Sequence, residues 1–183
     1  MKNMKIIYTI IFVLLAVNQA KAQDKFFTKT GYVSFYSHSL VEDIKADNNQ
    51  SLSIIDTKTG KIAINILMRS FMFKKALMQE HFNENYIESH KYPKAAFSGI
   101  INNYEDLDDE ITETEITGTL KIHGKEKEIT TRATIYIKEN EIKLSGNFNV
   151  EVADFDIKIP SIVSKNIAKT IKISFELSHK PYK

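Results

Sequence analysis

Alternation of apolar and polar side chains over the second half of the chain restricts the possible folds most. In one such stretch Ile171, Ile173 and Phe175 are separated by Lys172 and Ser174. A period of two places neighbouring side chains on opposite faces of a β-strand. The pattern therefore predicts long strands with one buried and one solvated face. These strands cover 112–123, 128–138, 141–152 and 170–178.

The first half of the chain continues this pattern in shorter stretches. Further strands are predicted at 31–37, 51–56, 61–69 and 96–103. Turn-forming residues at 57–60, 123–125 and 139–140 separate several of them, as in a succession of hairpins. Two segments interrupt the strands: residues 74–90 have helical spacing, and Pro160 begins a short helical segment over about 160–168. The predicted fold class is therefore all-β with eight antiparallel strands.

Eight amphipathic strands need a cover for their apolar faces. Two stacked sheets and one sheet closed into a barrel both provide it. An eight-stranded barrel is just wide enough to be filled by side chains or to hold a slender ligand. Gly99, Gly118 and Gly146 lie on the apolar parity of their strands. They either leave room for a channel or permit the bends of a small closed barrel, and the sequence leaves both interpretations open.

The N-terminus has the pattern of a secretory signal peptide. Lys2 and Lys5 precede an apolar run over 6–17, and Ala20-Lys21-Ala22 forms a small-x-small cleavage site. We therefore predict a signal peptide over 1–22, cleaved after Ala22, and a single domain over 23–183. An uncleaved anchor is the alternative, but the apolar run is short for a membrane span. The prediction implies a periplasmic or secreted protein without stable membrane insertion.

Charge and composition exclude several classes of function. Removing 1–22 removes three lysines and no acid, so 25 basic and 23 acidic side chains become 22 and 23. With this balance the protein has no net positive potential that would attract the phosphates of a nucleic acid. The chain has no cysteine, which excludes disulfides, thiolate metal sites and a lipidated cysteine. His81 with nearby glutamates lacks a second histidine at four-residue spacing, so neither a metal nor a cofactor is predicted.

Aromatic and flexible apolar side chains gather around the predicted helix. Residues 77–99 read LMQEHFNENYIESHKYPKAAFSG, and Phe71 and Phe73 precede them. Such side chains adapt well to an irregular apolar partner. The alternative is that they only pack the helix against an end of the barrel. His81 falls on the apolar stripe of this helix, where we expect a structural hydrogen bond.

Two blocks of this sequence resemble the hallmark stretches of the YceI-like family. The first is Leu77-Met78-x-x-His81-Phe82-x-x-x-Tyr86-x-Glu88-Ser89-x-Lys91-Tyr92-Pro93-x-Ala95-x-Phe97-x-Gly99. The second is Gly118-x-Leu120-x-Ile122-His123-Gly124. The resemblance implies an eight-stranded antiparallel barrel of lipocalin type. It also implies an exported protein whose apolar tunnel holds a polyisoprenoid, such as an isoprenoid quinone or a polyprenyl phosphate.

The resemblance and the apolar surplus together define candidate ligand-binding residues in the tunnel or at its mouth. They are Phe71, Phe73, Leu77, Met78, Phe82, Tyr86, Phe97, Gly99, Gly118, Leu120, Gly146 and Phe148. The expected role is transport, storage or sequestration of a polyisoprenoid or another long apolar lipid. One alternative is an envelope protein with a filled barrel and a structural or stress role. Another is an enzyme on an isoprenoid lipid, with His81 or His123 as acid-base group, although no catalytic signature predicts it. The oligomeric state stays open, with a dimer as one possibility.

Overall fold

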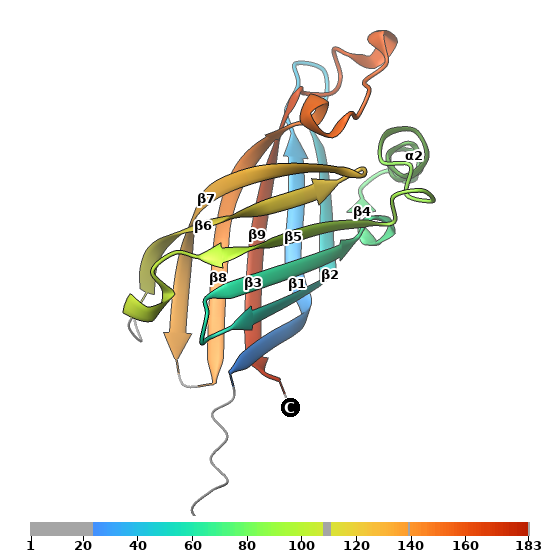
Figure 1. Cartoon of the computed structure of the whole chain (residues 1–183). Coiled ribbons are helices and arrows are strands. Elements are labelled where there is room, and N and C mark those ends of the chain that lie inside the picture. Colours follow the sequence, from blue (N-terminus) through green and yellow to red (C-terminus); the bar gives the residue numbers. More distant parts are fainter. Residues whose placement is uncertain (1–23, 108–110, 139, 183) are drawn as a thin grey trace, which may run out of the picture.

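The structure is a computed structural model that describes residues 24–107, 111–138 and 140–182 (Figure 1). The predicted signal peptide over 1–22 lies outside these residues. Eight antiparallel strands form the body of the molecule in the order β1-β9-β8-β7-β6-β5-β3-β2, and pairing of β1 with β2 closes the barrel. The predicted eight-stranded antiparallel barrel is thus confirmed. Its strands are β1 (Lys25–Ser37), β2 (Ile44–Asp56), β3 (Lys61–Leu67), β5 (Lys94–Ile101), β6 (Ile111–Ile122), β7 (Lys125–Lys138), β8 (Glu141–Glu151) and β9 (Thr170–Pro181).

Strands β1 and β2 are longer than the sequence pattern predicted. In β1 the register shifts on both sides of Gly31, and these irregularities break the alternation that marks a strand. In β2 the fully buried Asn48 is a polar residue on the inner face of the strand, before the predicted start at residue 51. Its Nδ2 donates to Leu67 O at 3.3 Å, and its Oδ1 accepts from Gln50 N at 2.8 Å. A buried side-chain amide is tolerated in a core when its NH₂ group and its oxygen both form hydrogen bonds. The strand therefore continues through Asn48.

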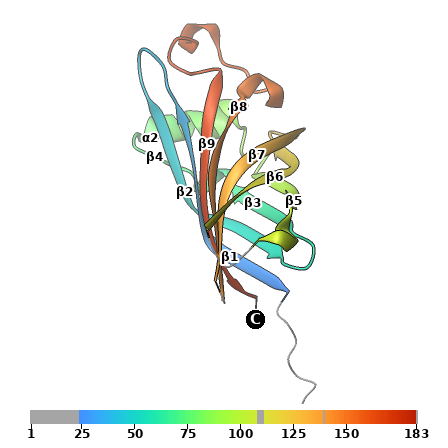
Figure 2. The same ribbon diagram turned by 90° about the vertical axis from the view of Figure 1, so that its left-hand side faces the viewer.

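The two ends of the barrel differ in what connects the strands. At the lower end in Figure 1, short connections join β2 to β3 and β7 to β8, and the 3₁₀ turn η4 (Tyr104–Asp106) follows β5. At the upper end lie the β1–β2 loop, the helical connection after β3 and the segment between β8 and β9. Figure 2 shows the β1–β2 hairpin and the segment 152–169 extending beyond the other strands.

The helical connection is shorter than the predicted helix over 74–90. After η2 (Met68–Ser70) and the two-residue strand β4 (Met72–Phe73), which pairs with β2, the helix α2 covers only Ala76–His81. A π-helical turn, η3 (Phe82–Tyr86), follows it, in which Ile87 N donates to Phe82 O at 2.9 Å. This wider turn changes the spacing at which side chains share a face. The predicted helix at a barrel end is therefore present, but it is shorter than predicted and its second half is π-helical.

The predicted helical segment over 160–168 is also too long. The structure has the 3₁₀ turns η5 (Val152–Phe155) and η6 (Ser161–Val163), with irregular chain around them. The segment is rich in β-branched residues, which have low helix propensity, and so short a stretch does not sustain a helix alone. None of the described helices is long and apolar enough to cross a membrane.

The lower half of the barrel is filled by buried apolar side chains. Its fully buried side chains include Ile55, Ile101, Ile135, Ile142 and Leu177, each at most 1% exposed. They come from five different strands near the lower end. None of these five borders the cavity described next. The barrel is therefore filled below and hollow above.

Candidate functional site

A cavity of about 310 Å³ occupies the upper half of the barrel. All eight barrel strands contribute side chains to its wall, as do α2, η3 and the segment 152–169. The wall is almost wholly apolar, and no charged lysine, arginine or carboxylate borders it among the described residues. The lining residues with a polar side-chain group are Ser37, His81, Tyr86, Thr131 and Asn166.

Two phenyl rings lie at the bottom of this cavity. The ring of Phe97 covers the paired glycines of β5 and β6: a Cβ atom on Gly118 would lie 2.9 Å from Phe97 Cζ and would collide with Ser98 O. Phe175 covers Gly146 in the same way, at 2.7 Å from such an atom. The phenyl rings therefore pack directly over the glycines. They fill the space that the absent glycine side chains leave, so the glycines do not border the cavity.

The upper rim is formed by α2 with η3 on one side and by the segment 152–169 on another. Met78, His81 and Tyr86 face the cavity from the helical side. Burial raises the pKa of the Tyr86 hydroxyl, which keeps this group neutral. His81 is an exposed residue of α2 that borders the cavity, so it lies where a ligand would pass. This position differs from the structural one that its spacing predicted.

An aromatic cluster holds the helical side against the barrel wall. Phe82 lies behind the lining residues, with ring centroids 5.3 Å from Phe35, 5.9 Å from Phe71 and 5.0 Å from Phe73. Aromatic pairs at these distances contribute about 0.5–1.5 kcal/mol each beyond simple burial. Phe82 therefore positions the rim and is not itself part of the lining.

The structure brings together seven of the twelve candidate residues. Leu77 is separate from them: it is 60% exposed and points into solvent. Because α2 is only six residues long before the π-helical turn, the predicted apolar stripe does not run along one face. Those that border the cavity are Phe71, Phe73, Met78, Tyr86, Phe97, Leu120 and Phe148.

Sequence reasoning missed the contribution of the segment 152–169. Ile159, Val163 and Ile167 border the cavity from this side. Their spacing of four residues was visible in the sequence, but we interpreted the segment only as a connection with a helical turn. The four-residue spacing of apolar side chains was the signal that could have identified this second side of the rim.

A polar contact around His123 ties three segments of the rim together. His123 Nδ1 lies 2.9 Å from Phe155 O, and Nε2 lies 3.2 Å from Glu88 Oε2. Lys91, and then His123, lower the pKa of the Glu88 carboxyl. Both partners of the ring are acceptors, so it donates to both only when both nitrogens carry a proton. This arrangement engages both nitrogens in holding the β6–β7 turn to η5 and to the end of the helical connection.

We expect His123→Ala to loosen the rim without opening the packed lower half. Loss of the contact to Phe155 O should cost about 1–3 kcal/mol, because an acceptor of a buried residue is left unpaired. Amide hydrogen exchange should quicken over 82–92 and 152–155 and stay unchanged for Ile142 and Leu177. His90→Ala, at an exposed position of the same connection, is the control. Unaltered exchange over 82–92 in the folded His123 variant would contradict this role.

No group of three or more His, Cys, Asp or Glu side chains is placed to hold a metal ion within the described ranges. The side chains of the glutamates near His81 in sequence do not converge on His81. Glu88 faces His123, while Glu80 and Glu84 border a polar hollow that also contains Arg69. The chemistry of the cavity is therefore that of apolar contact with a few neutral polar groups.

Comparison with known proteins gives a family and a set of similar structures. The YceI-like domain matches residues 22–179. Among curated proteins there is no significant match. A polyisoprenoid-binding domain from Saccharophagus degradans, implicated in plant cell wall breakdown, has a TM-score of 0.75 at 15% identity, covering 87% of this chain and 99% of that one.

Two further solved structures have the same fold. BcnA from Burkholderia cenocepacia has a TM-score of 0.69 at 18% identity, covering 81% of this chain and 95% of that one. The YceI protein from Campylobacter jejuni has a TM-score of 0.64 at 19% identity, covering 80% and 90%. At these identities the likeness concerns the fold of the barrel.

Proposed function

Because the chain belongs to the YceI-like domain family, we propose that it is an exported protein that binds a long apolar lipid of the polyisoprenoid type in its barrel. The observation that carries this proposal is the cavity of about 310 Å³ with a wall free of charged side chains among the described residues. Its volume lies near the lower end of the roughly 300–1,000 Å³ of small-molecule sites, which suits a slender chain.

The polar groups of the cavity indicate how such a lipid would be oriented. Ser37, His81, Tyr86 and Asn166 belong to the ends of strands or to the rim segments, whereas the deeper wall consists of phenyl and aliphatic side chains. Thr131 in the middle of β7 is the exception, and its hydroxyl donates to Asn147 O at 3.3 Å. An apolar tail would therefore enter first and rest on Phe97 and Phe175. The head group would stay at the rim, within reach of neutral hydrogen-bonding side chains.

Burial of apolar surface supplies the binding energy. At about 25 cal/mol per Å², burying some 400 Å² of ligand gives about 10 kcal/mol before the cost of association. No charged partner is needed for this. The similarity in fold to a domain described as polyisoprenoid-binding supports the same class of ligand. The basic and apolar N-terminus over 1–22 supports export to the periplasm or beyond, and the role would be transport, storage or sequestration.

Native mass spectrometry of the protein purified from its own compartment tests this proposal. We expect an adduct of several hundred daltons that solvent extraction releases as an isoprenoid lipid. The same protein, stripped of lipid, should take up an added isoprenoid quinone or polyprenyl phosphate. A bare mass together with no uptake of either lipid would contradict the proposal and favour a filled barrel with a structural role.

A further inference from the structure

Exposed apolar side chains stand at the tips of the segments that surround the cavity. Leu40 is fully exposed and Val41 is 63% exposed in the β1–β2 loop, and Ile162 is 90% exposed in η6. Ile44, the first residue of β2 after this loop, and Val163 of η6 line the cavity. Each segment therefore faces the hollow with one side chain and presents another to the surroundings.

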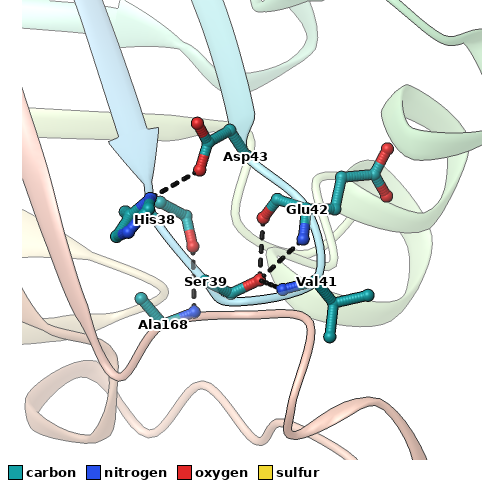
Figure 3. A network of polar contacts seen from close by, with 7 residues as sticks. His38, Ser39, Val41, Glu42, Asp43 and Ala168 are labelled. Atoms are coloured by element: carbon teal, nitrogen blue, oxygen red, sulfur yellow. Dashed lines mark hydrogen bonds and ion pairs between the residues drawn. The ribbon is translucent and has the colours of Figure 1, made fainter.

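Polar contacts hold these tips in place (Figure 3). Ser39 Oγ accepts from Glu42 N at 3.0 Å and donates to Glu42 O at 2.8 Å, which closes the β1–β2 loop into a tight turn. Ala168 N donates to Ser37 Oγ at 2.9 Å, which joins this loop to the segment 152–169. These bonds fix the loop, and Leu40 at its tip is exposed and does not border the cavity.

The charge around the tips is basic. From 157 to 175 the chain has Lys158, Lys165, Lys169 and Lys172 and no acid, and this stretch contains Ile162. Of the two acids in the β1–β2 loop, Glu42 forms an ion pair with Lys75, whereas Asp43 contacts the ring of His38 at 2.7 Å. The four lysines of this stretch therefore outnumber Asp43, the one acid of the loop without a lysine partner.

We infer that the rim of the barrel docks on a membrane surface that contains anionic phospholipid. Exposed apolar tips, one of them flanked by Lys158 and Lys165, match the bilayer interface, where apolar groups insert below the head groups and ammonium groups meet the phosphates. Docking places the opening of the cavity against the membrane. The purpose of this docking rests on the proposed function, because an apolar chain then passes between bilayer and cavity without crossing water.

A single tryptophan reports on the docking, since the chain has none of its own. Leu40→Trp should show a blue shift and a rise in emission with vesicles of equimolar phosphatidylglycerol and phosphatidylcholine, and less with phosphatidylcholine alone. The matched control is Ile111→Trp, because Ile111 is 73% exposed at the opposite end of the barrel. No shift for Leu40→Trp, or an equal shift for both variants, would overturn the inference.

A second experiment separates docking from ligand binding. The double variant Leu40→Ser, Ile162→Ser should lose at least about tenfold in vesicle partitioning, because two apolar insertions are removed. Its uptake of an isoprenoid quinone supplied in detergent should equal that of the unaltered protein. Vesicle binding equal to that of the unaltered protein would refute the docking surface.

Failure of the two proposals is distinguishable in the same assays. If the unaltered protein binds vesicles but takes up no quinone from detergent, the docking stands and the proposed ligand fails. If it takes up quinone but does not bind vesicles that contain phosphatidylglycerol, the ligand stands and the docking fails.

Discussion

Replacing Ile64 by tryptophan is expected to remove most of the uptake of a long apolar lipid while the barrel stays folded. Ile64 lies on β3, borders the cavity and is only partly buried because it faces the hollow. The indole ring would occupy part of the roughly 310 Å³ available to a ligand. If the ligand loses about 100 Å² of apolar burial, its affinity falls by about 2.5 kcal/mol, or about 70-fold.

The control for this experiment is the same substitution on the outer face of a nearby strand. Ile100 on β5 is 48% exposed, so Ile100→Trp adds an indole ring without entering the cavity. Quinone titration followed by native mass spectrometry gives the affinities, and circular dichroism verifies the fold. Ile129→Trp, on the cavity wall of β7, serves as a second variant if Ile64→Trp does not fold. Full affinity in a folded cavity variant would place the ligand elsewhere.

Acid is expected to destabilise the protein through one buried histidine in the lower half. His179 is fully buried, with Nδ1 3.1 Å from Ile142 O and Nε2 2.8 Å from Ser53 Oγ. Burial lowers its pKa from 6.5 to about 4. Above pH 6.5 the ring is neutral in both states. Between about pH 6.5 and 4 the unfolded chain takes up a proton that the native protein does not, so the free energy of unfolding falls by about 3 kcal/mol over this range.

Urea denaturation at a series of pH values measures this contribution. His179→Gln keeps a donor toward Ile142 O and an acceptor toward the Ser53 hydroxyl but does not titrate. The carboxyls of Glu88 and Asp43, whose pKa values are lowered, also lose stabilising contacts in acid, so the difference between protein and variant isolates His179. His90→Gln, at an exposed position, should leave the pH dependence unchanged. Equal pH dependence in the protein and the His179 variant would refute this assignment.

The strands were predictable where burial alone decides the pattern. Alternation along β6 to β9 reflects one face on the core and one in water, and this needs no knowledge of distant contacts. The early part of β2 was not predictable by the same rule. Asn48 is buried there because Leu67 O, nineteen residues away, accepts from its amide. A partner so distant in sequence leaves no local signal.

The candidate site was predictable only where the spacing stayed regular. The π-helical turn at Phe82–Tyr86 changes the spacing after α2, and Phe82 lies behind the cavity wall. Leu77, in the short α-helix before this turn, points outward. The sequence also showed glycines on the inner faces of the strands. Whether they leave an open channel depends on the side chains that pack over them. A ring two residues away along β5 fills the room that Gly99 leaves, and the sequence alone does not give its rotamer.

The phenyl rings of Phe97 and Phe175 also determine how far a tail can reach into the barrel. A larger residue at Gly146 would push Phe175 toward the rim and shorten the hollow. A smaller side chain in place of either ring would extend it toward the packed lower half. In a barrel of this construction, the length of chain that is accommodated therefore depends on a few interior positions. It can change between relatives whose outer surface and rim stay the same.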